Sequence, residues 1–390
     1  MNTDVKIRDE EILLIGLSRL TFSKELTQKI QDLVKAVTDW EYFISLANEH
    51  GIAALVFHNF ENLGFLPLLP EYCVKSLRNY LMLSISRNVF HKTALEESLG
   101  LLNKAGIKVV LIKGFALEMT VYGDAGLRQM TDVDILIDRS DYIKARNILM
   151  SGGYESLPVK SGFHKPVMSW IGKHLPSLLK NGASVDIHLE LFAGKKNDLT
   201  KQLYDTSKEI RIDKETAFIP APQLFFLYLV KHLTHHEIRN ESQLRLYTDL
   251  VVLIEKYREE IINYKLLSNA QKAGMSKILA RKFEPLRDLW GIPFPDWVDD
   301  FVNRWLSADS INKFVFFLKS PKNNELDHPG YAYRTTLKEI PGIHRKILFI
   351  LGDIFPSMTF MKKRYKYKSS WKVLIHYPHR FGKLFYLFKK

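Results

Sequence analysis

The spacing of apolar residues divides the chain into two helical regions with a short alternating region between them. Before residue 105 and after residue 222, apolar positions recur every three or four residues, a period typical of amphipathic helices. We therefore expect helices over 10–20, 22–37, 39–50, 71–104, 223–237, 243–256, 264–273 and 276–284. Pro285 should stop or kink the last of these, because proline lacks the backbone N–H that a helix needs.

Between the helical regions the period shortens to two, which is typical of strands. The pattern predicts an α+β fold in which a small mixed β-sheet is embedded between N-terminal and C-terminal helical regions. A chain of 390 residues is long enough for more than one core. The expected parts are an N-terminal helical region, an α/β core, a C-terminal helical domain and a basic, aromatic C-terminal segment, at 1–105, 106–215, 216–360 and 361–390.

One predicted strand, at 131–137, carries two aspartates two positions apart. Side chains alternate between the faces of a strand, so Asp132 and Asp134 should share one face, while Val133, Ile135 and Ile137 face the core. Two carboxylates held this close repel each other unless a cation lies between them. Hard divalent cations such as Mg²⁺ bind carboxylate oxygens together with substrate phosphates. The strand is therefore predicted to form half of a metal site for phosphoryl chemistry.

The neighbouring elements strengthen this prediction. An apolar strand at 107–112 leads directly into Lys113-Gly114 and a helical pattern; such a turn offers backbone N–H groups and a positive dipole end to an anion. Lys113 adds a cation beside it. Downstream, the alternating strand 183–189 places Asp186 as a third carboxylate, with Glu190 as an alternative further along the same face.

These motifs resemble those of the DNA polymerase beta-like nucleotidyltransferase superfamily. More narrowly, the order of L-K-G, Tyr, Arg, D-x-D and a later V-D-x-H strand is similar to that of an uncharacterised bacterial nucleotidyltransferase family. The matching residues are Leu111, Lys113, Gly114, Tyr122, Arg128, Asp132, Asp134, Val185, Asp186 and His188. The chain departs from the broader superfamily at the turn, where Lys-Gly stands in place of Gly-Ser; this departure concerns how the triphosphate is held.

The resemblance implies a metal-dependent nucleotidyltransferase that moves NMP from an NTP, with ATP as the first expectation, to an acceptor hydroxyl and releases pyrophosphate. It implies that two Mg²⁺ ions, or Mn²⁺, are held by the catalytic carboxylates of Asp132, Asp134 and Asp186. Lys113 and Gly114 are expected to contact the nucleotide. Arg128 has two open roles, neutralising phosphate or bracing the D-x-D carboxylates.

The acceptor is left open. A small molecule or a protein is the first expectation, and nucleic acid is the runner-up. A non-catalytic module that binds a nucleotide or a partner is the alternative from another class. His232, His235 and His236 lie at helical spacing; without a neighbouring Cys or an H-E-x-x-H pattern, contact with nucleotide or acceptor is favoured over metal binding.

Composition adds two points. A single cysteine, Cys73, excludes an internal disulfide and is expected in the core, and the start of the chain lacks the apolar segment of a signal peptide, so we expect a cytoplasmic protein. The net charge is +13, and residues 361–390 hold ten Lys or Arg without an acidic residue. This segment is open to three interpretations: a packed helix with a solvated basic face, a nucleic-acid contact, or a peripheral contact with an anionic membrane surface.

Overall fold

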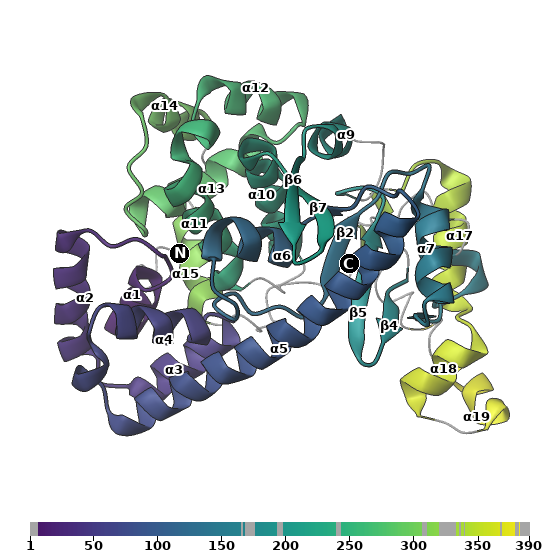
Figure 1. Cartoon of the computed structure of the whole chain (residues 1–390), viewed down its shortest axis with the longest axis horizontal. Helices are drawn as coiled ribbons and strands as arrows, with labels where there is room; N and C mark the ends of the chain where they lie inside the picture. Colours follow the sequence, from purple (N-terminus) through teal and green to yellow (C-terminus); the bar gives the residue numbers. More distant parts are fainter. Residues whose placement is uncertain are drawn as a thin grey trace. The chain divides into compact units, whose positions relative to one another are not determined.

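The computed structural model describes residues 7–164, 167, 176–192, 198–238, 243–305, 310–319, 333–334, 337–338, 340–366, 369–378 and 382. The chain forms two compact units that interleave along the sequence (Figure 1). One unit is built from 1–93, 112–131 and 219–323, and the other from 94–111, 132–218 and 324–390. The domain boundaries expected from the sequence remain predictions.

The second of these units contains the β-sheet. The described strands form one sheet in the order β3-β4-β5-β2-β1-β7-β6. Their bounds are Val110–Leu111 (β1), Val133–Leu136 (β2), Glu155–Ser156 (β3), Leu178–Lys180 (β4), Ala183–His188 (β5), Lys208–Ile212 (β6) and Glu215–Ile219 (β7). β2 runs parallel to β5 and β1 parallel to β7, whereas β1–β2, β3–β4 and β4–β5 are antiparallel. The expected α+β class with a mixed sheet is confirmed.

Helices and close contacts support this sheet. The unit includes α7, α9, α17, α18 and α19 and the short turn η3, at Tyr142–Ser151, Asp198–Asp205, Ile343–Ile354, Met358–Tyr365, Ser370–Leu374 and Gly162–His164. The end of α7 packs tightly against α5: a Cβ on Gly152 would lie 2.4 Å from Leu101 Cδ1. The backbone N–H of Ser357 donates to Lys160 O at 2.7 Å, and Ser161 Oγ donates to Phe355 O at 2.7 Å. These bonds fasten the start of α18 to the 160–164 segment.

The first unit is helical. It contains α1–α4, η1, the first part of α5, α6, the π-helical turn η2 and α10–α15, at Asp9–Gly16, Lys24–Ala36, Trp40–Glu49, Ala53–Asn62, Leu66–Leu68, Glu71–Lys104, Lys113–Leu117, Glu118–Tyr122, Pro222–Ile238, Leu244–Ile261, Tyr264–Lys272, Ser276–Asp288, Asp296–Trp305 and Ser310–Lys319. The expectation that Pro285 stops this helix is wrong, because α13 continues through it to Asp288; a kink at Pro285 stays a prediction. Cys73 is buried, and burial raises the pKa of its thiol to about 12. None of the helices among the described residues has the length and apolar character needed to cross a membrane.

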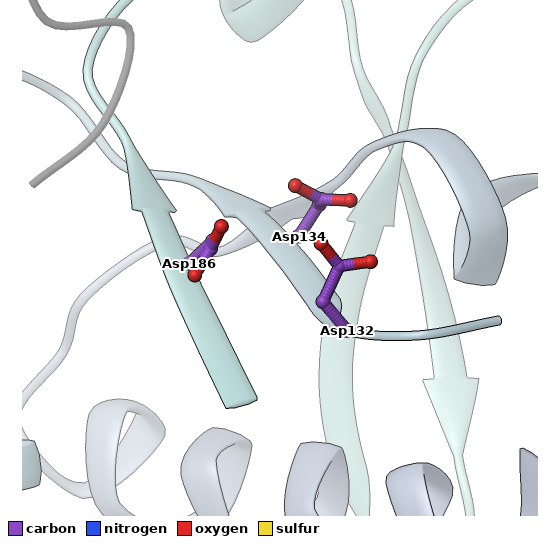
Figure 2. Close-up of side chains that lie close together, drawn as sticks. All are labelled: Asp132, Asp134 and Asp186. Carbon is purple, nitrogen blue, oxygen red and sulfur yellow. The ribbon is translucent and has the colours of Figure 1, made fainter. Parts of the chain in front are cut away.

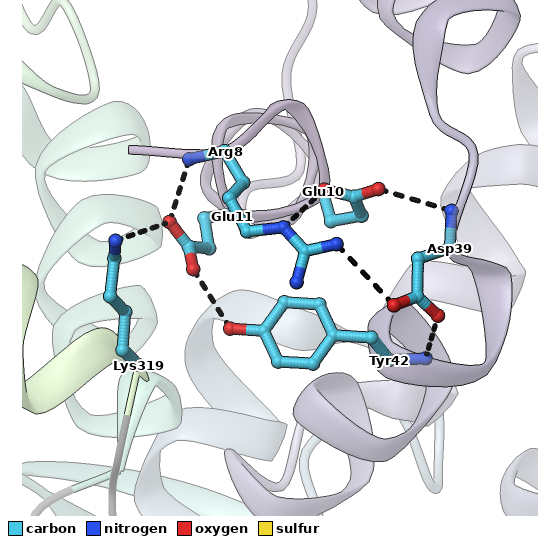
Figure 3. Close-up of polar contacts among 6 residues, drawn as sticks. All are labelled: Arg8, Glu10, Glu11, Asp39, Tyr42 and Lys319. Atoms are coloured by element: carbon cyan, nitrogen blue, oxygen red, sulfur yellow. Dashed lines mark hydrogen bonds and ion pairs between the residues drawn. The ribbon is translucent and has the colours of Figure 1, made fainter. Parts of the chain in front are cut away.

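A buried carboxylate joins the start of the first unit to its last helix. Glu11 accepts hydrogen bonds from the backbone N–H of Arg8 and from Tyr42 Oη, both at 2.8 Å, and Lys319 Nζ lies 3.8 Å away (Figure 3). The first of these bonds closes a capping box that satisfies an unpaired amide at the start of α1. Asp39 accepts from the backbone N–H of Tyr42 and so caps α3. Three helices, α1, α3 and α15, therefore meet at Glu11.

His50 links the end of α3 to two other helices. Its Nδ1 accepts from the backbone N–H of Leu244 at 3.0 Å, so its Nε2–H donates to Leu318 O at 2.8 Å. The ring is fully buried, and burial lowers its pKa to about 4 because the charged imidazolium is poorly solvated there.

This burial makes the stability of the unit depend on pH. The folded pKa of His50, about 4, lies below the unfolded value of about 6.5, so the unfolded chain binds a proton first as the pH falls. The stabilising contribution of neutral His50 should be complete above pH 7. Its loss should lower the free energy of unfolding by about 2 kcal/mol as the pH falls from 7 to 5. Denaturant unfolding at both pH values measures this loss, and His50→Gln should show a correspondingly smaller change. An equal pH dependence in the variant would contradict it.

Candidate metal and nucleotide site

Three carboxylates lie together on one face of the sheet. Parallel pairing sets Asp134 of β2 directly opposite Asp186 of β5, and neighbouring strands lie about 4.8 Å apart. Asp132 stands two residues before Asp134, just ahead of β2, and points to the same region (Figure 2). One oxygen of each carboxylate lies within 4.8 Å of the other two. The structure thus brings together the three residues that the sequence proposes as metal ligands.

The environment of these carboxylates fits a hard divalent cation. Asp134 and Asp186 are only 4% and 8% exposed, and Asp132 is intermediate. Three like charges at this separation with little water between them repel, and a cation bound to an oxygen from each would relieve the repulsion. An all-oxygen donor set suits Mg²⁺ or Mn²⁺ and does not suit metals that prefer sulfur. Asp132 is the most exposed of the three.

The turn after β1 has an unusual backbone. Lys113 begins α6 with φ +54°, a left-handed conformation that costs a residue with a Cβ about 1–2 kcal/mol. In the resembling superfamily the first residue of this turn is glycine, which adopts that conformation without cost. The lysine therefore occupies a glycine-type position, and such strain is found at functional sites. The amide groups at the start of α6 belong to a helix of only five residues.

Gly114 is required by close packing. A Cβ at this position would lie 2.8 Å from Met130 Sδ and 2.9 Å from Arg128 Nη1, closer than real Cβ contacts allow. In the described contacts, the glycine lets the segment before the D-x-D strand approach the start of α6. Whether it also approaches phosphate remains a prediction.

Arg128 lies in a buried, bidentate ion pair. Its Nε and Nη2 each donate to the Asp249 carboxylate of α11 at 2.8 Å, and Tyr122 Oη donates to the same group at 2.9 Å. Asn88 of α5 accepts from the backbone N–H of Met130 at 3.2 Å and donates to Arg128 O at 2.9 Å. The segment that leads to Asp132 is therefore fixed from two helices. Planar arginine suits such a pair.

Comparison with known proteins decides the family. A family model described as an uncharacterised nucleotidyltransferase matches residues 36–290, well over half of the chain. The chain belongs to this nucleotidyltransferase family. A search of curated proteins finds no match. The matched region includes all three carboxylates and the Lys113 turn, and membership of the family supports a role in nucleotidyl transfer.

His188 contacts one of the proposed metal ligands. His188 Nε2 lies 2.6 Å from Asp134 Oδ1, and both side chains are buried. An imidazole that donates from Nε2 would hold the Asp134 carboxylate in place, as outer-shell partners of metal ligands do. No role of its own is predicted for His188 from the sequence, although its place two residues after Asp186 puts it on the carboxylate face.

Removal of this hydrogen bond should weaken metal binding. His188→Ala is expected to lower the affinity for Mn²⁺ by about 10-fold or more, the usual range for outer-shell partners, whereas His188→Gln, which keeps a donor, should recover part of the loss. Electron paramagnetic resonance titration of free Mn²⁺ measures the affinity without any turnover. An unchanged affinity in His188→Ala would show that the bond does not position Asp134.

The remaining candidate residues take part in other interactions. Glu190, the alternative carboxylate, accepts from Arg139 at 3.0 Å. The rings of His232 and His236 meet edge to face at 4.6 Å, and Tyr228 stacks on His232 at 5.9 Å. Among the described residues, the group able to hold a metal ion consists of Asp132, Asp134 and Asp186. The contact of the histidines with a nucleotide or acceptor stays a prediction.

Proposed function

We propose that the protein is a Mg²⁺-dependent nucleotidyltransferase that transfers NMP from an NTP, first of all ATP, to a hydroxyl of a small-molecule or protein acceptor. The observation that carries the proposal is the set of carboxylates on β2 and β5, whose oxygens lie within 4.8 Å of one another. Membership of a nucleotidyltransferase family supports it.

The residues have distinct roles in this proposal. Asp132, Asp134 and Asp186 would hold the metal, which would supply charge neutralisation for the attacking and leaving oxygens of an in-line displacement. Asp186 accepts the proton of the attacking hydroxyl as the acceptor oxygen bonds to the α-phosphorus and the bond to pyrophosphate breaks. Lys113 holds the triphosphate at the start of α6. Positioning and electrostatics then provide most of the rate enhancement.

Titration calorimetry with ATP, GTP, CTP and UTP, each with and without Mg²⁺, tests the proposal and identifies the donor. We expect one nucleotide to bind only with the metal and to lose binding in Asp132→Asn/Asp134→Asn. Asp138→Asn is the matched control, because Asp138 follows the same strand and bonds to Ser140. Binding that ignores both metal and substitution would contradict the proposal and favour a non-catalytic nucleotide-binding module.

The strained turn offers a test of Lys113. Lys113→Gly removes both the ammonium group and the left-handed strain, whereas Lys113→Ala removes the ammonium alone. The glycine variant should therefore be more stable than the alanine variant by about 1 kcal/mol, while both bind the nucleotide about 10-fold more weakly, which corresponds to the loss of one charge-assisted contact. Denaturant unfolding and calorimetry measure the two effects. Wild-type affinity in both variants would remove Lys113 from the nucleotide site.

A further inference from the structure

The C-terminal helices α18 and α19 pack against each other through a small apolar core. Met361 of α18 and Val373 of α19 are fully buried. The Tyr365 ring stacks on His376 with centroids 4.1 Å apart, and Tyr377 Oη donates to Pro356 O at 2.6 Å. Figure 1 shows this pair in yellow next to their labels. These contacts hold α19 in a defined orientation, with Tyr365 and Tyr377 of the 361–390 segment facing inward.

The opposite face of α19 carries large apolar side chains that face solvent. Trp371, Leu374 and Ile375 are 62%, 57% and 65% exposed. Their spacing of three and four residues places them on one side of a helix. The packed interpretation of this segment accounts for Tyr365 and Tyr377, but it does not account for an outward tryptophan beside two outward aliphatic residues, since exposed apolar clusters mark interaction surfaces.

The segment that carries this face contains basic residues and no acidic residue. Arg364 and Lys366, at the end of α18, are exposed, and residues 361–390 contain ten Lys or Arg without a single Asp or Glu. A partner that covers the face must therefore tolerate positive charge or carry negative charge. The partner must also accept the three apolar side chains, which we call the α19 apolar face: Trp371, Leu374 and Ile375.

We propose that the α19 apolar face docks on an anionic lipid bilayer. Tryptophan favours the boundary between headgroups and acyl chains, where its ring is buried and its N–H stays wet, and aliphatic side chains enter the same zone on interfacial helices. Each Lys or Arg near an anionic leaflet strengthens binding about fivefold. A second copy of the chain fits less well, because both copies would bring the same positive charge, and three side chains supply far less than the ~800 Å² per partner of a standard interface.

Vesicle flotation tests this proposal independently of nucleotidyl transfer. The full chain is mixed with vesicles of phosphatidylcholine alone or with about a third phosphatidylglycerol, at low and high salt. We expect flotation with the anionic vesicles only and a large decrease at high salt. The variant Trp371→Ser/Leu374→Ser/Ile375→Ser should bind the anionic vesicles at least 10-fold more weakly, and its solvent-exposed substitutions should leave the fold intact, as circular dichroism would show.

A matched variant controls for the loss of exposed apolar surface in general. Met82, Leu83 and Val89 of α5 are 53%, 61% and 52% exposed, and their replacement by serine should leave flotation unchanged. The proposal is overturned if the wild type does not float with anionic vesicles or if the α19 variant floats equally well. It is also overturned by either of two other results that the α19 variant abolishes. One is a dimer in sedimentation equilibrium, and the other is salt-sensitive binding to single-stranded RNA.

Discussion

Asp134→Asn should reduce nucleotidyl transfer by at least about 100-fold, the effect expected when one centre of charge stabilisation is removed from a site. Asparagine keeps the shape of the side chain and an acceptor for His188, which lies 2.6 Å from Asp134 Oδ1, but it removes the negative charge that a cation requires. The same change relieves repulsion among carboxylates whose oxygens lie within 4.8 Å of one another. Without metal, the variant should therefore be at least as stable as the wild type.

Two measurements check this result. Pyrophosphate release from the NTP selected by calorimetry, with water as the default acceptor, reports activity, and thermal unfolding without metal reports stability. Asp186→Asn should behave in the same way, whereas Asp138→Asn, at an exposed position after β2, should resemble the wild type. Activity of Asp134→Asn within a few-fold of the wild type would exclude Asp134 from the mechanism, and a large loss of stability would point to a structural role.

The second large effect concerns the buried pair of Arg128 and Asp249. Arg128→Met leaves the Asp249 carboxylate buried with a hydrogen bond from Tyr122 Oη, and both members of the ion pair are 6% exposed or less. Removing one member of a buried ion pair costs about 3–5 kcal/mol, while replacing both by apolar residues of similar size is often nearly neutral. We expect Arg128→Met to lower the free energy of unfolding by about 3–5 kcal/mol. Arg128→Met/Asp249→Leu should recover most of this lost stability.

The double variant also separates the predicted role of Arg128 in neutralising phosphate from the role that its pair with Asp249 indicates, fixing the segment before Asp132. If the arginine only fixes the segment before Asp132, the folded double variant should bind Mg²⁺-nucleotide within a few-fold of the wild type. If it neutralises phosphate, binding should fall by 10-fold or more while stability is restored. Denaturant unfolding and calorimetry give the two quantities. Equal instability of the single and double variants would contradict the account of the pair.

The sequence predicts the centre of the fold well because its signals there are local. Alternation within 131–137 and 183–189 identifies β2 and β5 and the faces of their aspartates. Such a pattern does not show which strands pair. The pairing of β2 with β5, and the parallel register that sets Asp134 opposite Asp186, are seen only in the structure. The family resemblance supplied the expectation that these strands cooperate.

Other features escape the sequence for physical reasons. Arg128 and Asp249 are 121 residues apart, and only tertiary packing pairs them. α4, at Ala53–Asn62, buries seven of its ten residues, so it shows no polar face and no clear helical period. The left-handed backbone at Lys113 (φ +54°) cannot be predicted from the sequence, because lysine rarely adopts this conformation. Pro285 is accommodated within α13, where its local propensity is overridden by packing.

The central claim is that Asp132, Asp134 and Asp186 bind a divalent cation together with a nucleotide. The most direct test is a crystal of the protein grown with Mn²⁺ and a non-hydrolysable analogue of the NTP that calorimetry selects, with anomalous diffraction recorded at the manganese edge. The account predicts an anomalous peak within about 2.3 Å of oxygens from these carboxylates, next to the triphosphate. A well-ordered nucleotide and metal bound elsewhere, with no peak between the three carboxylates, would contradict it.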